Sequence, residues 1–137
     1  MFFNKEEKDN NNHNLVKIGA LLIHAAKIDE HYSKIEEEII KKTLLELGAE
    51  QINLENLIGK AKKCEEDSNQ ILDFTKEIKN LENNDKIMII KSLWKIIYSN
   101  KDADIYETNL MRRLAGLLYI DSKIMGDIKE EIKKENL

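Results

Sequence analysis

The sequence predicts an all-α protein, a compact single-domain bundle of about seven helices. Three observations support this fold class. Apolar residues recur at the three- and four-residue spacing of helices along most of the 137 residues, and no strand pattern of competing length is present. Proline is absent, and only 5 glycines occur, so the chain lacks the turn residues that a β-sandwich needs. A chain of this length suits one domain.

The pattern divides the chain into a leader and one folded domain. Residues 1–13, which end in the polar run Asn10–His13, are expected to form a loose N-terminal leader or a short helix before the core, and residues 14–137 are expected to form the helical domain. Within the domain, seven apolar stripes each keep to one face of a helix. In chain order, these stripes lie over Leu15–Ala25, Ile35–Leu47, Leu54–Ala61, Ile71–Leu81, Ile87–Ile97, Leu110–Leu118 and Ile124–Ile132.

Most of the predicted helices have residues that are typical of helix ends. Ser33 with Glu36 has the spacing of a capping box, in which the cap oxygen accepts a backbone N–H and the glutamate reaches back. Asp104 with Glu107 repeats that spacing. Gly48 is the residue type that most often ends a helix. The other expected caps are Asn53 for the third helix, Ser68 or Asn69 for the fourth, Asn83–Asp85 for the fifth and Asp121 for the last.

Charge and composition speak against several classes of function. The 26 acidic and 22 basic residues give a net charge of −4, and lysine alternates with glutamate instead of forming a basic face, so nucleic acid is not an expected partner. The single cysteine, Cys64, excludes an internal disulfide and a cysteine-rich zinc site. No apolar run reaches the roughly 18–20 residues of a membrane span, and the N-terminus does not resemble a secretory signal. We therefore expect a cytoplasmic protein.

The sequence shows no constellation of residues for catalysis. We expect His24 at the edge of the core and His31 in a solvated turn, and neither has a histidine or glutamate partner four residues away. Cys64 has lysine neighbours that favour a thiolate but no identifiable histidine partner. Trp94 fits a core position. Since no glycine-rich phosphate loop is present either, the expectation is a protein that is not an enzyme.

The chain contains an internal repeat of a helix–turn–helix unit. Residues 22–36 align with residues 93–107 when the chain is shifted by 71 positions (93 − 22). In each unit an apolar helix ends in a carboxylate or an amide, Asp29 or Asn100, and the two-residue pattern of a capping box follows. Two such hairpins predict a pseudo-twofold core with the remaining helices packed around it.

The two turns allow two interpretations, and the sequence leaves both open. Capping alone explains the Ser/Asp and Glu positions, because each cap contributes about 1 kcal/mol. If the turns lie side by side, however, five side chains converge as oxygen ligands. These candidate ligands are Asp29, Glu36, Asn100, Asp104 and Glu107. Divalent cations such as Ca²⁺ take about six to eight oxygens, so the second interpretation is a weak site for Ca²⁺ or another divalent cation.

The two turns resemble the paired motif of the tellurite-resistance TerB-like family, written approximately Asp-Gly-x-φ-Ser/Asp-x-x-Glu. Residues 29–36 form the first copy and residues 100–107 the second, and the flanking Leu93–Ile96 and Leu110–Leu118 are also similar to the family. The likeness covers roughly residues 15–135.

Two positions depart from the family pattern. Glu30 and Lys101 stand where the family has glycine, so the turn backbone can differ. Asn100 stands where the family has its second aspartate, which removes one negative charge from the candidate cation site.

The resemblance implies an all-α fold of about seven helices and an acidic surface around the two turns. It also implies metal binding and a chemical-stress response within a membrane-associated complex, and it implies no enzymatic activity. The leading interpretation is therefore a non-enzymatic bacterial TerB-like domain that binds a divalent cation weakly, a protein partner, or both. The alternative is a plain helical interaction or scaffold module without a metal site. Either interpretation leaves the partner and the oligomeric state open, and allows peripheral association with a membrane complex.

Overall fold

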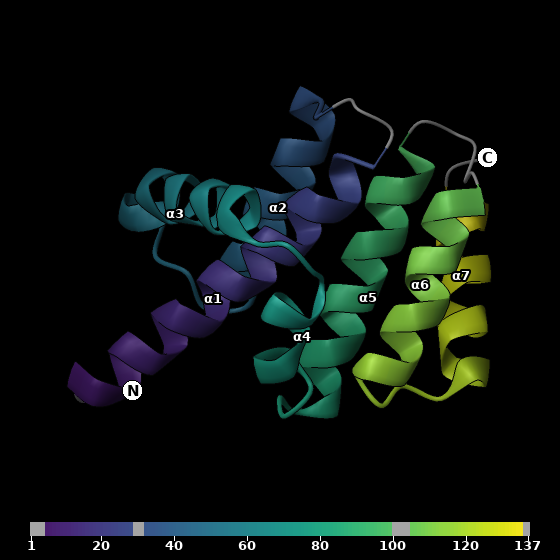
Figure 1. The fold of residues 1–137 in the computed structure, drawn as a ribbon. Helices are drawn as coiled ribbons and strands as arrows, with labels where there is room; N and C mark the ends of the chain where they lie inside the picture. The colour runs from purple at the N-terminus through teal and green to yellow at the C-terminus, as the bar shows by residue number, and fades with distance from the viewer. Residues whose placement is uncertain (1–4, 29–31, 100–104, 136–137) are drawn as a thin grey trace.

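The computed structural model describes the backbone of residues 5–28, 32–99 and 105–135, and the side chains of residues 11–28, 32–99 and 108–135. Over these residues the protein consists of seven α-helices and one 3₁₀ turn, without a strand (Figure 1). The predicted all-α fold is thereby confirmed. The elements are α1 (Lys5–Ala26), α2 (Lys34–Glu46), η1 (Gln51–Asn53), α3 (Leu54–Asp67), α4 (Leu72–Ile78), α5 (Asn83–Tyr98), α6 (Ile105–Leu117) and α7 (Ser122–Glu135).

Helix α1 is the central element of the fold. It packs against α2, α3, α4 and α5. From Ile18 to Ala26, every residue except His24 is buried. A helix that has neighbours on most sides buries most of its circumference, so its apolar residues extend beyond the single stripe that a surface helix shows.

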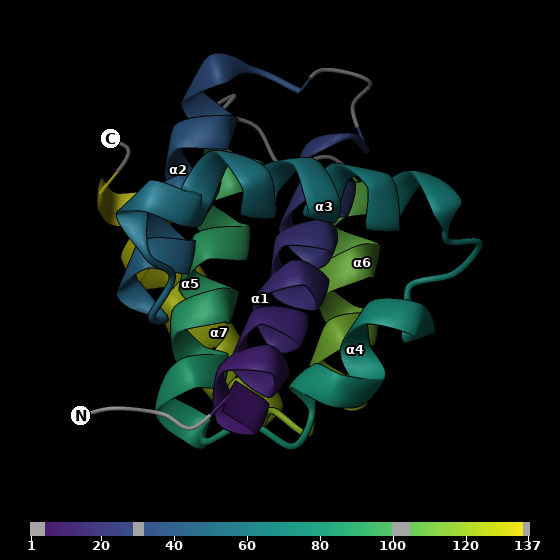
Figure 2. The same cartoon turned by 90° about the vertical axis from the view of Figure 1, so that its left-hand side faces the viewer.

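The crossing of α1 and α3 depends on two small residues. A Cβ atom built at Gly19 would lie only 2.9 Å from the Cβ of Ala61, which is closer than real Cβ contacts come. The absence of a side chain at Gly19 therefore lets the two helices approach each other. Figure 2 shows α3 lying across α1 at this side of the molecule.

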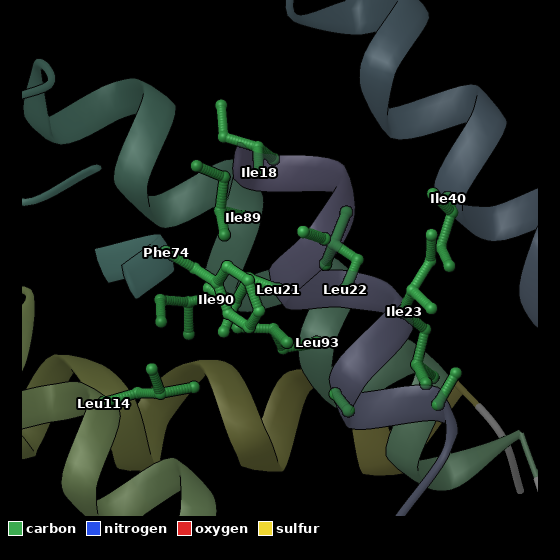
Figure 3. Packing of buried hydrophobic residues seen from close by; sticks show 14 of the residues in the cluster. Ile18, Leu21, Leu22, Ile23, Ile40, Phe74, Ile89, Ile90, Leu93 and Leu114 are labelled. Atoms are coloured by element: carbon green, nitrogen blue, oxygen red, sulfur yellow. The ribbon is translucent and has the colours of Figure 1, made fainter. Parts of the chain in front are cut away.

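Helix α5 is the second buried helix and connects the helices around α1 to the C-terminal part of the bundle. It packs against α1, α2 and α7. The close-up in Figure 3 shows Leu21 and Leu22 of α1 near Ile90 and Leu93 of α5, with Phe74 beside them. A buried hydrogen bond of 2.6 Å also links Thr43 Oγ1 of α2 to Ser92 Oγ of α5. The two predicted hairpins, α1–α2 and α5–α6, are thus held together by apolar packing and by one buried polar contact.

Some helix ends agree with the sequence prediction. Ser33 and Glu36 form the predicted capping box at the start of α2. Gly48 follows α2 with φ of +110°, the left-handed region in which glycine is favoured. Asp121 Oδ1 accepts a hydrogen bond of 2.7 Å from the backbone N–H of Lys123, so the predicted cap of the last helix is confirmed.

Of the other predicted caps, Asn53 occupies its predicted position without a side-chain cap hydrogen bond, and those of α4 and α5 are wrong. Ser68 ends α3 instead of starting α4, because its hydroxyl donates to the carbonyl oxygen of Cys64. Helix α4 starts three residues after Asn69, at Leu72, without a side-chain cap. Asn53 stands at the start of α3, but its side chain makes no cap hydrogen bond, since a 3₁₀ turn precedes the helix. Asn83 to Asp85 lie inside the first turn of α5, and Glu82 takes the cap position.

The expected leader is helical from Lys5 onward. Helix α1 continues through the polar run Asn10–His13 without a break. No glycine or proline interrupts this run, and Asn12 and His13 lie on the exposed side, so polarity alone does not end the helix. Three residues of the predicted apolar stripes, Ile35, Leu72 and Ile124, are exposed instead of buried.

Candidate functional site

The candidate cation site depends mainly on residues outside the described part of the chain. Asp29, Asn100 and Asp104 lie outside the described residues. Glu107 belongs to α6, but its side chain is not among those described. Of the five candidate ligands, the structure describes the side chain of Glu36 alone. The convergence of the five oxygens remains a prediction.

The helices that flank the two turns end on the same side of the molecule. Figures 1 and 2 both show the end of α1, the start of α2, the end of α5 and the start of α6 at the upper end of the bundle. A hollow of about 450 Å³ lies there, and we call it the turn-end hollow. Its lining residues are His24 near the end of α1, Ile28 two residues after α1, and Asn109, Leu110 and Arg113 from α6. The hollow therefore lies between Ile28, the residue before Asp29, and α6, the helix that contains Glu107.

Glu36 is held at the start of α2 by the capping box. Its Oε1 accepts a hydrogen bond of 2.9 Å from the backbone N–H of Ser33, and Ser33 Oγ accepts one of 3.1 Å from the backbone N–H of Glu36. The side chain is almost fully buried, with 1% of the residue exposed. The box fixes the carboxylate at the N-terminus of α2, where the helix dipole favours negative charge.

A polar cluster of Tyr32, Glu37 and Lys62 fastens the same end of α2 to α3. The Lys62 ammonium lies 3.0 Å from Glu37 Oε1 and 5.4 Å from the centre of the Tyr32 ring. The Tyr32 hydroxyl donates to Glu37 at 3.4 Å. The hydrogen bond from Lys62 lowers the pKa of Glu37, and burial followed by the charge of Glu37 raises the pKa of Tyr32. The cluster thus anchors the chain directly after the first turn.

A second polar contact anchors the chain directly before the first turn. Lys27 Nζ lies 2.8 Å from Glu65 Oε2 on α3, and His24 Nδ1 lies 3.4 Å from Glu65 Oε1. The hydrogen bond to Glu65 raises the pKa of Lys27. The His24 side chain is 39% exposed, which confirms its predicted place at the edge of the core. Helix α3 therefore holds both sides of the first turn.

The sequence did not reveal these anchors on α3. Lys62 and Glu65 belong to a lysine- and glutamate-rich helix, and their partners lie 25 and 41 residues away in the sequence (62 − 37 and 65 − 24). Helical periodicity predicts contacts at three or four residues and gives no signal for contacts at such separations. Only the crossing of α3 over α1 brings them to the turn.

Among the side chains of residues 11–28, 32–99 and 108–135, no group of three or more His, Cys, Asp or Glu residues is arranged to hold a metal ion. None of the helices in the described part combines the length and the apolar character that crossing a membrane requires.

The fold and the paired hairpins define a small all-α domain built on a repeated helix–turn–helix unit. The family model described as tellurite resistance protein TerB matches residues 16–130, which is most of the chain. The protein therefore belongs to the TerB family, as the resemblance of the two turns predicted. No curated protein and no solved structure matches the chain significantly.

Proposed function

We propose that this TerB domain binds a divalent cation weakly between its two turns and presents the same end of the bundle to a protein partner in a chemical-stress response. The cation would be held by Asp29, Glu36, Asn100, Asp104 and Glu107. In this proposal the protein is cytoplasmic, is not an enzyme, and associates with a membrane complex only through its partner.

One observation is the main support for the proposal. Both hairpins turn at the same end of the bundle, and the turn-end hollow is lined by residues next to both turns, Ile28 before Asp29 and Asn109 after Glu107. The candidate donors are four carboxylates and one amide. Such oxygen donors match the preference of Ca²⁺, Mg²⁺ and Mn²⁺ and offer no thiolate or imidazole for Zn²⁺.

A helical interaction module without a metal site is the second candidate function. The observation that favours it is the complete capping box, because the box explains the burial and orientation of Glu36 without a cation. The anchors on α3 would then serve to present a fixed polar surface to a partner protein. The two candidates differ in one measurable property, the response of the folded state to divalent ions.

Thermal unfolding with and without divalent ions distinguishes the two candidates. The protein is melted in EDTA and then in separate excesses of Ca²⁺, Mg²⁺, Mn²⁺ and Zn²⁺. A cation present at 100 times its Kd stabilises the folded state by about 2.7 kcal/mol, so we expect a clear rise in Tm with an oxygen-preferring ion. The rise should disappear in the double variant Asp29→Ala, Glu107→Ala.

A matched control removes the same charge elsewhere. The double variant Glu55→Ala, Glu131→Ala removes two exposed carboxylates on α3 and α7. It should keep the full response to the cation. Identical melts in all ions, or equal losses in the two double variants, would contradict the cation site and leave the interaction module as the function.

A further inference from the structure

A groove lies between α6 and α7, with Trp94 of α5 among its lining residues. Its volume is about 240 Å³. Met111 and Arg112 line it from α6, and Met125, Gly126 and Lys129 line it from α7. We call it the α6–α7 groove. Its lining residues recur at helical spacing on two neighbouring helices, so the groove follows from the way that these helices lie beside α5.

The groove combines an apolar interior with positive charge. Met111 and Met125 line the groove from the core, with 1% and 7% of each residue exposed, and the flexible methionine side chain adapts well to ligands of different shape. The ammonium of Lys129 lies 5.5 Å from the centre of the Trp94 ring. Neither Arg112 nor Lys129 forms a salt bridge with any described residue. In a protein with a net charge of −4, these two cations at one groove favour an anionic ligand.

Trp94 adds an unpaired donor to the same place. Trp94 is 2% exposed, and among the described residues its buried Nε1 has no hydrogen-bond partner. Buried donors in folded proteins are nearly always paired, so an exception next to a groove marks a functional candidate. The partial positive charge of this N–H has the same sign as the two cations.

Gly126 widens the groove. It lies inside α7, where glycine is the least favourable residue apart from proline. A Cβ atom built there would meet nothing within 4 Å, so packing does not explain the glycine, in contrast to Gly19. A side chain at this position would lie beside the groove and reduce its opening.

We propose that the α6–α7 groove binds a small carboxylate with an apolar body. The apolar part would lie between the two methionines over Trp94, and the carboxylate would face Arg112 and Lys129, since guanidinium and ammonium groups form charge-assisted hydrogen bonds with carboxylates. The volume is below the range of about 300–1,000 Å³ typical of sites for drug-sized molecules, so it suits a short acid. A free acid and the C-terminal carboxylate of an apolar peptide share this chemistry.

The chain contains a single tryptophan, so Trp94 reports directly on the groove. The wild-type protein is titrated with octanoate while the Trp94 fluorescence and the NMR signal of its indole N–H are followed. We expect a saturable change, and at least fivefold weaker binding of the neutral octanamide. A parallel titration with acetyl-Ala-Ala-Leu, as free acid and as amide, determines whether a peptide C-terminus is bound in place of the free acid.

Two pairs of variants test the assignment of the site. Gly126→Leu should lower the affinity for the tighter of the two acids at least fivefold, whereas Gly59→Leu should not, although both replace an unpacked helical glycine. The double variant Arg112→Gln, Lys129→Gln should lower the affinity at least tenfold. Its charge-matched control is Lys123→Gln, Lys133→Gln, which should leave the affinity unchanged.

Three results would overturn the proposal. The first is the absence of a saturable Trp94 change with either acid. The second is equal binding of octanoate and octanamide together with equal binding of the peptide acid and its amide, because the cations would then have no role. The third is an equal effect of the Gly126 and Gly59 variants on the affinity.

Discussion

Helices α1 and α7 both contribute to the hydrophobic core, but they differ in how much of their surface is buried. Helix α1 is buried on most of its circumference between Ile18 and Ala26 and contacts four other helices. Helix α7 is amphipathic and buries one narrow stripe of Met125, Ile128 and Ile132 against α5. Helix α1 is surrounded by neighbouring helices, whereas α7 covers the core from one side.

This difference determines where each candidate site can be built. The first turn follows the end of α1, which α3 contacts through Glu65. The α6–α7 groove lies along the edge of the covering helix, where small residues such as Ala115 and Gly126 leave space. The candidate cation site needs ligands in fixed positions, and it lies next to α1. The α6–α7 groove needs an opening for its ligand, and it lies next to α7.

The largest contrast is expected for one apolar residue on each helix. Leu22 of α1 is fully buried, so Leu22→Ala leaves a cavity and should reduce the free energy of unfolding by about 2–5 kcal/mol. Ile124 of α7 is 42% exposed, so Ile124→Ala should change it by less than about 1 kcal/mol. Urea unfolding followed by circular dichroism measures both values. Similar losses for the two variants would contradict the contrast between the helices.

The glycines of the two helices should respond in opposite directions. Gly19→Ala introduces a Cβ atom 2.9 Å from that of Ala61, and the overpacking should outweigh the better helix propensity of alanine, with a net loss of about 1–2 kcal/mol. Gly126→Ala meets no neighbour and should raise the free energy of unfolding by about 0.5–1 kcal/mol. The same urea titrations measure both changes. A gain at Gly19 would show that α3 moves away without cost.

The predicted apolar stripes failed in different ways on the two helices. On α7 the three- and four-residue spacing identified Ile128 and Ile132 correctly, but it also selected the exposed Ile124 and missed the buried Met125. For α1 the same spacing selected Leu15, Ile18, Leu22 and Ala25, and it missed the burial of residues between them, such as Leu21 and Ile23. Periodicity assumes a single buried face, so it underestimates a helix that has neighbours on several sides.

The sequence predicted only those features of the site that depend on residues close together in the chain. The capping box of Ser33 and Glu36 was predicted because its residues are three positions apart and the chemistry is local. The anchors Lys62 and Glu65 were missed because their contacts depend on how α3 crosses α1. The repeat in the sequence predicted the paired hairpins, and the family comparison confirmed the TerB assignment that the two turns suggested. All five candidate cation ligands, Glu36 included, stay predictions.

The smallest contrast concerns one ion pair near each helix. Glu37 lies 3.0 Å from Lys62, is partly buried, and belongs to the cluster that fastens α2 to α3, which lies across α1. Glu131 of α7 lies 3.7 Å from Lys91, and its side chain is 52% exposed. Exposed pairs contribute little, so Glu131→Gln should change the free energy of unfolding by less than about 0.3 kcal/mol, and Glu37→Gln should reduce it by about 0.5–1 kcal/mol at pH 7.

The pH dependence gives the sign of the Glu37 contribution. Lys62 lowers the pKa of Glu37 in the folded state below its ordinary value of 4.5, so the carboxylate stabilises the fold at pH values above 4.5. This contribution is lost as the pH falls through the lowered pKa and Glu37 becomes protonated. The difference between the wild type and Glu37→Gln should therefore be constant from pH 7 to pH 5 and shrink toward zero in more acidic solution. Urea titrations between pH 7 and pH 3 measure it, and a difference that persists at pH 3 would show that the glutamine disturbs packing and not charge.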